Sequence, residues 1–374
     1  MTNAPALADR AHLAAIAEQG RALILSLQDA SGAYPASPTF SAYRGYSWFR
    51  DGAFIADAMS AAGEIASASA FFDWCARMLT ERSDDIKRIV AAAHAGVPVP
   101  DSDMLATRFT LDGREGDDEW WDFQLDGYGL WVWALAEHVQ RHELDPGRWI
   151  PAVELTLDYL TSSWQRPCYD WWEEHSEHVH VSTLGCISAG LHAGASLTAE
   201  DSARSRAAAA TAATIDDFIR SQGVRDGHLV KWIGTDAVDA SLGSLMAPLG
   251  VVDARGPLGA ATIAELDAQL VVDGGMHRFL ADTYFGGGQW PLLSCFLGLA
   301  WHRAGSTDRA LELLRWSAGT VRESGTMPEQ VADHLLDSSF VDEWIERWGT
   351  SADPLLWSSA MYLRLALELG VIES

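Results

Sequence analysis

The sequence predicts an all-α fold in which paired helices surround a single axis. Apolar residues recur at three- and four-residue spacing in about a dozen segments. These segments have similar lengths and follow one another at intervals of about 25 to 30 residues, as in a ring of helical hairpins. Only two short stretches, 179–181 and 227–233, look extended. Together these observations predict a closed ring of helices without a large sheet.

Clusters of Gly, Pro, Asp or Ser separate the expected helices and set their limits. Asp51, Asp84 and Asp308 each begin a periodic segment, and Pro354 begins the last one. The alanine run 207–210 is a strong helix former inside a longer segment. The expected helices are 7–27, 51–62, 67–79, 84–95, 124–141, 148–160, 182–192, 199–219, 260–270, 289–304, 308–322 and 354–369.

The chain is expected to form a single domain over residues 1–374. Its 374 residues are 48% hydrophobic, enough for a sizeable core, and no Pro-rich or Ser-rich linker interrupts them. The first residues lack a basic segment followed by an unbroken apolar one, so no signal peptide is expected. No window of 18 uncharged apolar residues suggests a membrane span.

Charge and cysteine usage narrow the classes of partner. The formal net charge is −26, and Lys and Arg do not gather into a stripe that could neutralise phosphates. Nucleic acid and anionic membranes are therefore excluded as partners, and the acidity fits solvated helix faces. The four cysteines are scattered and form no CxxC pair, which favours reduced thiols in a cytoplasmic protein. The sequence does not indicate an oligomeric state.

Tryptophan is unusually frequent, with 17 residues, and several of them adjoin carboxylates. An indole offers a flat apolar face and one N–H donor, which suits the apolar face and hydroxyl rim of a sugar ring. The alternative is that large aromatic rings simply fill a wide helical core. We prefer this alternative for four isolated residues, Trp133, Trp149, Trp232 and Trp316.

Four clusters between the helices combine carboxylates with aromatic residues or proline: 46–51, 120–126, 169–174 and 327–330. Hydrolysis of a glycosidic bond requires one carboxylic acid to protonate the leaving oxygen and one carboxylate to activate water or attack carbon. Glu173 and Glu174 are adjacent and cannot both point at one atom, so one would react and the other would bind hydroxyls. Trp171 and Trp172 beside Glu173 should raise the pKa of its carboxyl.

These clusters resemble the motifs of glycoside hydrolase family 15, the glucoamylases, glucodextranases and related exo-acting α-glucosidases. Any one motif is weak evidence, but the order of six along nearly the whole chain is specific. They are Tyr46 to Asp51, the Gln-Leu-Asp-Gly-Tyr-Gly run 124–129, Tyr169 to Glu174, the glycine-rich run 282–290, Pro-Glu-Gln at 328–330, and Leu-Trp-Ser at 356–358.

The resemblance implies an (α/α)6 barrel and an inverting enzyme that removes one glucose from a non-reducing end. Glu173 would be the general acid and Glu329 the general base. Arg50 and Asp51 would hold the terminal glucose, with Arg278 and Glu174 near the first two sugars. The remaining candidates for the pocket wall are Trp120, Trp172, Trp357, Trp290, Tyr46, Trp48 and Tyr284. For Trp48, a buried prop behind Arg50 is an equal alternative.

The sequence departs from many bacterial relatives because no β-sandwich precedes the helices and no starch-binding module follows them. A short, barrel-only form resembles isomaltose glucohydrolases, which predicts cleavage of an α-1,6 bond in a short oligosaccharide. A trehalase or a glucoamylase that prefers maltose and malto-oligosaccharides is the alternative. Trp290 or the turn 286–288 would form the wall on the leaving-group side. A catalytically inactive sugar-binding protein is a remote alternative, because both carboxylates are present.

Three other sequence features could indicate a metal or phosphate site, but each has weaker support. The acidic run 117–122 is similar to the metal-binding aspartates of terpene cyclases, but it lacks a partner motif. His178 and His180 have a spacing compatible with metal, yet no third ligand is evident, which favours packing. The run 286–288 lacks the Lys of a phosphate loop and suits a close-approach turn. We therefore expect neither a metal nor a cofactor.

Overall fold

The computed structural model describes residues 4–116, 120, 123–199 and 202–373. Its helices account for most of the described chain. They are α1 (Ala4–Leu27), α2 (Phe49–Ala61), α3 (Ile65–Glu81), α4 (Ser83–His94), α5 (Asp126–His142), α6 (Ile150–Ser163), α7 (Val181–Leu197), α8 (Ala203–Gln222), α9 (Gly243–Met246), α10 (Pro257–Leu270), α11 (Pro291–Ala304), α12 (Thr307–Gly319), α13 (Val341–Trp348) and α14 (Leu356–Glu368). The 3-10 turns are η1 (Asp101–Asp103), η2 (Ala240–Leu242), η3 (Tyr284–Gly286) and η4 (Ser338–Phe340).

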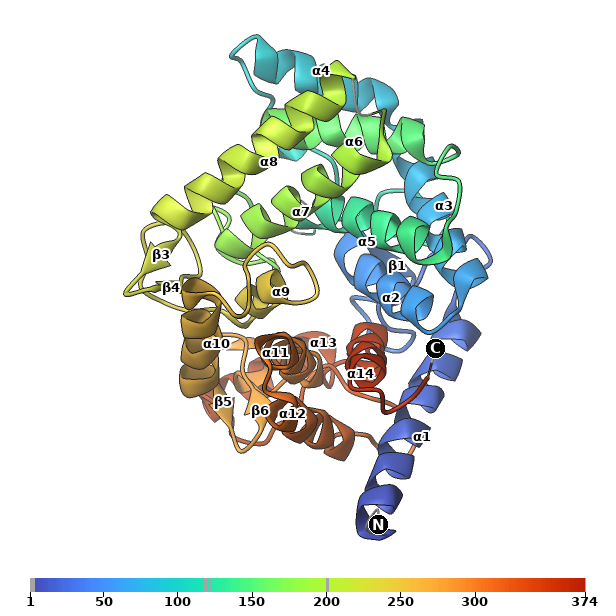
Figure 1. The fold of residues 1–374 in the computed structure, drawn as a ribbon, viewed down its shortest axis with the longest axis vertical. Helices are drawn as coiled ribbons and strands as arrows, with labels where there is room; N and C mark the ends of the chain where they lie inside the picture. The colour runs from blue at the N-terminus through green and yellow to red at the C-terminus, as the bar shows by residue number, and fades with distance from the viewer. Residues whose placement is uncertain (1–3, 117–119, 121–122, 200–201, 374) are drawn as a thin grey trace.

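Two concentric layers of helices form a closed ring (Figure 1). Contacts run around the inner layer from α2 to α5, α7, α9, α11 and α14, and α14 packs on α2 to close the circle. In the outer layer, α3 packs on α2, α8 on α7, α10 on α11, α12 on α11, and α1 on α14. The prediction of an all-α barrel of helical pairs is confirmed.

Inner helices are buried on nearly every side, which explains their apolar or small residues. Residues 49–60 of α2 are all buried, and α7, α11 and α14 are similar. At the crossing of α5 and α7, Gly129 faces Gly190 at backbone distance. A Cβ on Gly129 would lie 2.2 Å from the carbonyl oxygen of Cys186. Only glycine at this crossing therefore allows the two inner helices to approach so closely.

Every helix expected from periodicity is present, with ends that differ by a few residues. Two helices were not expected: the single turn α9 and the peripheral α13. The described residues also form three two-stranded antiparallel sheets. These are β1 (Tyr46–Trp48) with β2 (Arg108–Thr110), β3 (Val224–Arg225) with β4 (His228–Leu229), and β5 (Val271–Val272) with β6 (Gly275–Met276). The expected extended stretch 227–233 thus begins in β4, and Trp232 forms a bridge with His180.

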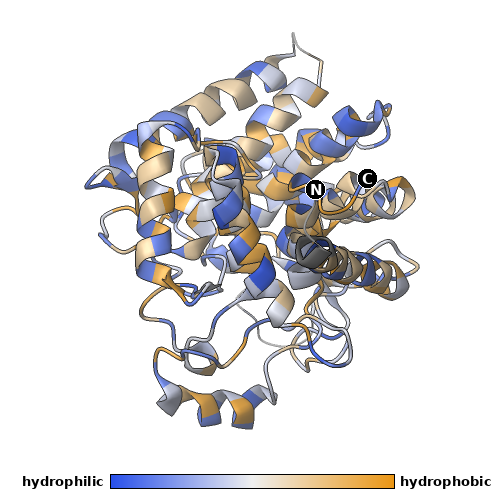
Figure 2. Cartoon of the chain, turned by 60° about the horizontal axis from the view of Figure 1, so that its bottom comes forward, coloured by the Kyte–Doolittle hydropathy of each residue, from blue (hydrophilic) through white to orange (hydrophobic). Residues whose placement is uncertain are grey.

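The inner helices α2, α7, α11 and α14 begin within predicted site motifs or a few residues after them. One end of the ring therefore collects segments that lie far apart in the sequence. Most helices carry both hydrophobic and hydrophilic residues along their length (Figure 2). Among the described residues, no helix is long and apolar enough to cross a bilayer. The four cysteines are buried and form no disulfide bond.

Candidate active site

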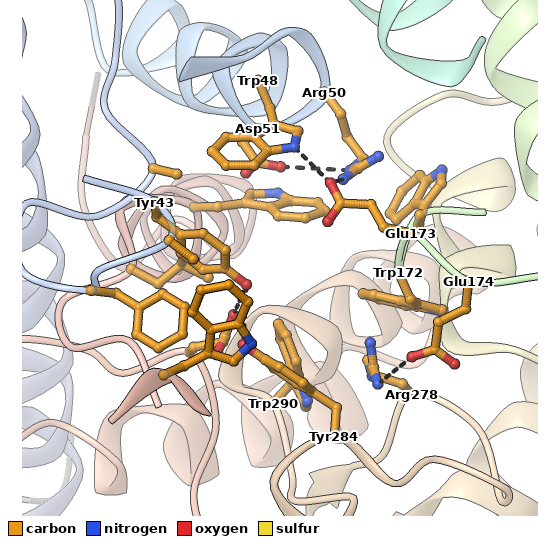
Figure 3. Close-up of a pocket in the computed structure, with 18 of the residues that line it drawn as sticks. Tyr43, Trp48, Arg50, Asp51, Trp172, Glu173, Glu174, Arg278, Tyr284 and Trp290 are labelled. Carbon is orange, nitrogen blue, oxygen red and sulfur yellow. Dashed lines mark hydrogen bonds and ion pairs between the residues drawn. The ribbon is translucent and has the colours of Figure 1, made fainter. Parts of the chain in front are cut away.

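A cavity lies where the starts of the inner helices meet. Its lining includes the first turns of α2 and α14, the loops before α2 and α7, η3, α13 and the segments around Glu329. The lining residues are Ala36, Phe40, Ala42, Tyr43, Trp48, Arg50, Asp51, Trp120, Trp171, Trp172, Glu173, Glu174, Arg278, Thr283, Tyr284, Trp290, Glu329, Trp344, Trp348, Leu355 and Trp357. Figure 3 shows Trp48, Arg50 and Asp51 on one side of this cavity and Tyr284 and Trp290 on the opposite side.

Burial distinguishes the floor of the cavity from its mouth. The floor residues are all less than one-tenth exposed and include Arg50, Asp51, Trp171, Trp290, Glu329 and Trp357. The mouth residues are half-buried and include Tyr43, Trp120, Glu174, Tyr284, Trp344 and Trp348. The cavity is therefore a pocket with a closed end, where one end of a chain-like ligand can enter and the rest must remain toward the mouth.

Arg50 is fixed at the floor by acidic and amide partners. Its Nη1 donates to Gln124 Oε1 at 2.6 Å and to Asp126 Oδ2 at 3.0 Å. Asp51 Oδ1 lies 3.5 Å from Arg50 Nε. Burial raises the pKa of Asp51 to about 7, although the Arg50 charge opposes this shift. The rigid guanidinium and the neighbouring carboxyl form a pair suited to binding two hydroxyls of one sugar.

Glu173 projects from the pocket wall between an indole and a guanidinium. Trp48 Nε1 donates to its Oε1 at 2.7 Å, and Arg50 Nη2 lies 3.9 Å from the same oxygen. Burial raises the pKa of Glu173, and the Arg50 charge and the Trp48 hydrogen bond counter part of this rise. The backbone of Glu173 has φ +63°, a left-handed conformation that is uncommon for a non-glycine residue and typical of functional sites.

A tight turn, 170–174, imposes this conformation. Asp170 Oδ1 accepts hydrogen bonds from the backbone N–H groups of Trp172 and Glu174, both at 2.9 Å. The buried Lys231 lies with its Nζ 3.3 Å from Asp170 Oδ2 and 2.9 Å from Asp239 Oδ2. Asp239 Oδ2 also accepts the indole N–H of Trp172 at 2.9 Å. Lys231 is thus the shared cation of Asp170, which bonds the backbone of the turn, and Asp239, which bonds the Trp172 indole.

Glu329 lies on the floor and is 1% exposed. Tyr43 Oη donates to its Oε1 at 2.9 Å, and Ser351 Oγ donates to its Oε2 at 3.0 Å. Burial raises the pKa of Glu329 to about 7, and both hydrogen bonds oppose the shift. Its backbone N–H donates to Ala352 O at 2.8 Å, and Leu355 N donates to Met327 O at 3.0 Å. The two ends of the segment 327–355 are therefore joined by backbone hydrogen bonds.

On the far wall, Arg278 connects Glu174 to the glycine-rich loop. Its Nη2 lies 3.1 Å from Glu174 Oε1, and its Nε donates to Asp282 Oδ2 at 2.7 Å. Trp172 and Trp290 pack beside this group, with ring centroids 5.7 Å apart. Burial raises the pKa of Glu174, and the Arg278 charge counters it.

All but one of the predicted site residues line this cavity. Tyr46 is the exception: it lies outside the lining, with the Arg108 guanidinium 3.8 Å from its ring centroid. Trp48 contacts Glu173 directly and so does more than support Arg50. Among the residues at the site that were not predicted are Tyr43, Ser351, Trp344 and Trp348. Each lies outside the quoted motifs, so only the tryptophan count hinted at two of them.

The sequence features that suggested a metal or phosphate site have structural explanations wherever they fall on described residues. His178 stacks on Trp232 with ring centroids 4.3 Å apart. The turn 286–288 is absent from the cavity lining and packs against 330–337, where a Cβ on Gly288 would lie 2.5 Å from Gln330 Oε1. Residues 117–119 and 121–122 of the acidic run lie outside the described residues. Over the part of the chain that the structure describes, His, Cys, Asp and Glu form no cluster suited to a metal.

Comparison with known proteins identifies the family. The family model described as glycosyl hydrolases family 15 matches residues 10–367. The chain belongs to glycosyl hydrolases family 15. The isomaltose glucohydrolase of Kribbella flavida is 50% identical over 363 residues, which cover 97% of this chain and 94% of that protein. The Trehalase 2 of Sulfolobus acidocaldarius is 27% identical and covers 80% of this chain and 56% of that protein.

Solved structures of family 15 relatives share the fold along the full chain. A glycosidase variant in complex with glucose superposes with a TM-score of 0.95, is 48% identical, and both chains are covered completely. Family 15 enzymes are inverting, exo-acting glucoside hydrolases, and the present chain is a glycoside hydrolase of this kind. The closed-ended pocket agrees with exo action, because only a chain end can reach its floor.

Proposed function

We propose that this enzyme hydrolyses isomaltose and releases β-glucose from the non-reducing end, with Glu173 as general acid and Glu329 as general base. The observation that carries the proposal is the placement of two buried carboxyls in one closed-ended pocket. They come from separate loops, before α7 and after α12, and have different partners, Trp48 for Glu173 and Tyr43 for Glu329.

In the proposed reaction the terminal glucose occupies the floor, where Arg50 and Asp51 bind its hydroxyls. Glu173 gives its proton to the glycosidic oxygen as the bond from that oxygen to the anomeric carbon breaks. Glu329 takes a proton from a water molecule whose oxygen forms the new bond on the opposite face of the ring. Attack from the opposite face converts an α-glucoside into β-glucose.

The raised pKa of Glu173 favours the protonated form that a general acid needs near neutrality. Tyr43 and Ser351 donate to Glu329, and both hydrogen bonds favour the carboxylate that a general base needs. Glu174 and Arg278 form an ion pair in the cavity lining and would bind hydroxyls of the two sugars.

The α-1,6 linkage is supported by the 50% identity to the isomaltose glucohydrolase. An α-1,6 bond has one more rotatable bond than an α-1,4 bond, so its leaving sugar can turn toward a different wall of the mouth. Trehalose and maltose are the alternative substrates. We also propose that the enzyme acts in the cytoplasm on short oligosaccharides, which fits its free cysteines.

The test is to measure kcat/KM on isomaltose, maltose, nigerose, kojibiose and trehalose, while proton NMR follows the anomer of fresh product. Isomaltose should have the highest kcat/KM, and β-glucose should appear before mutarotation. A preference for trehalose, or equal activity on maltose and soluble starch, would reject the proposed substrate. Initial release of α-glucose would reject Glu329 as the base.

A further inference from the structure

Helix α13 crosses the mouth of the cavity, and its two tryptophans face inward. Trp344 and Trp348 both belong to the cavity lining. They are four residues apart and therefore lie on the same face of the helix. Ile345 is turned about 100° around the helix from Trp344 and is 44% exposed.

Trp344 is held in a fixed orientation against η3. Its indole Nε1 donates to Thr283 O at 2.9 Å. Its ring meets Tyr284 edge-on, with centroids 4.9 Å apart, and also packs on Phe285. These separations correspond to aromatic rings in direct contact, so no sugar ring can pass between Trp344 and Tyr284.

Trp348 closes the other side of the same wall. Its ring centroid lies 6.3 Å from that of Trp120, again within the range of contacting rings. Ser41 Oγ donates to Trp348 O at 3.2 Å and ties the end of the helix to the loop before β1. The half-buried rings of Trp120, Trp348, Trp344 and Tyr284 thus form one aromatic wall around part of the mouth.

Both indoles pack at the edge of the hydrophobic core, but neither is inside it, because α13 has no fully buried residue. Two large apolar rings on such a helix contribute less to folding than the same rings inside the inner layer, where burial of each side chain would be complete. Their common direction, toward the mouth of a sugar pocket, indicates contact with the ligand.

We propose that Trp344 and Trp348 form the outer wall of the subsite for the leaving sugar and limit the substrate to two sugar units. The inference rests on the proposed function for the identity of the disaccharide. The apolar face of the leaving sugar packs against the indoles, while Glu174 and Arg278 bind its hydroxyls from the opposite side. A third sugar would have to displace the wall, and the cost of this displacement disfavours longer chains.

The experiment compares kcat/KM for isomaltotriose with kcat/KM for isomaltose in the wild type, Trp344→Ala and Trp348→Ala. Ile345→Ala is the matched control, since it alters the same helix on its exposed side. Each tryptophan variant should raise the ratio of trisaccharide to disaccharide kcat/KM by about tenfold, because the third sugar no longer has to displace the wall, whereas the lost stacking raises KM for both substrates. The inhibition constant of glucose, which reports the floor, should stay within about twofold of the wild type.

An unchanged ratio in both tryptophan variants, or an equal change in Ile345→Ala, would overturn the proposal. A wild type that cleaves isomaltotriose as fast as isomaltose would also overturn it. If Trp348→Ala does not fold, Trp348→Phe preserves an aromatic ring but shortens the wall, and its ratio should still rise. If maltose proves to be the substrate, the ratio of maltotriose to maltose tests the wall independently of the linkage.

Discussion

The phenol of Tyr43 donates a hydrogen bond to Glu329, with its Oη 2.9 Å from Oε1, and the same Oη lies 3.2 Å from the hydroxyl of Tyr284. The carboxyl is buried, so this hydrogen bond is one of the few interactions that favour its ionised form. The carboxylate form of Glu329, which the proposed base requires, is therefore stabilised by a residue 286 positions away in the sequence.

Tyr43→Phe should move the acidic limb of the pH profile to higher pH. The variant loses a hydrogen bond to the carboxylate, and hydrogen bonds to charged groups contribute about 1.5–3 kcal/mol, so kcat should fall by about tenfold or more. The acidic limb of kcat/KM reports ionisation of Glu329, whose pKa is already raised to about 7. Tyr362→Phe, which removes a distant buried hydroxyl bonded to Leu13 O, is the control. An unshifted acidic limb in Tyr43→Phe would contradict the assigned role.

Glu173→Gln and Glu329→Gln should each lower kcat on the disaccharide by on the order of a hundredfold while the fold is retained. An α-glucosyl substrate with an aryl or fluoride leaving group needs little protonation, so it should restore activity to Glu173→Gln alone. Glu174→Gln should chiefly raise KM, because Glu174, paired with Arg278, is proposed to bind hydroxyls of the substrate. Normal kcat in Glu329→Gln would exclude this residue as the base.

Burial of Glu329 should make the wild type less stable as the pH rises. Its folded pKa of about 7 lies above the value of 4.5 for an unperturbed Glu, so the stabilising protonated form is lost between these pH values. This difference corresponds to at most about 3 kcal/mol of unfolding free energy, complete above pH 7. Urea unfolding at pH 4 and pH 8 should show a smaller decline for Glu329→Gln than for the wild type. Parallel declines would show that the pKa is not raised.

Lys231→Met should impair both stability and chemistry. The variant leaves Asp170 and Asp239 buried without their shared cation, and breaking a buried ion pair costs about 3–5 kcal/mol. The turn that holds Glu173 would loosen, so kcat should fall and the basic limb of the pH profile should move. Lys87→Met removes an exposed ion pair and should change neither quantity. Lost stability with an unchanged kcat and pH profile would limit Lys231 to a structural role.

Periodicity was sufficient to predict the paired helices because most of them bury one face or all faces in the ring. It missed α9, which is a single turn inside the inner layer, and it missed α13. The eight residues of α13 are too few for a helical period to emerge, and they follow an irregular segment after Glu329.

Motifs located most of the candidate site because its charged residues occur in short contiguous runs. Tyr43 and Ser351 lie outside these runs, and their hydrogen bonds to Glu329 arise only when distant segments meet. Tyr46 shows the reverse case, since it belongs to a motif yet packs beside Arg108 outside the cavity lining. Tyr46 and Trp48 lie on the same face of β1, with ring centroids 6.4 Å apart, so Tyr46 stands behind Trp48 relative to the cavity.

Two backbone hydrogen bonds, between Met327 and Leu355 and between Glu329 and Ala352, hold together the two ends of the loop that carries α13. Changes of length or sequence within 332–350 can then alter the mouth of the cavity, while the paired ends of the loop keep the carboxyl of Glu329 in place. Exchange of this loop between relatives would be a route to new chain-length preferences that leaves the inner ring of helices untouched.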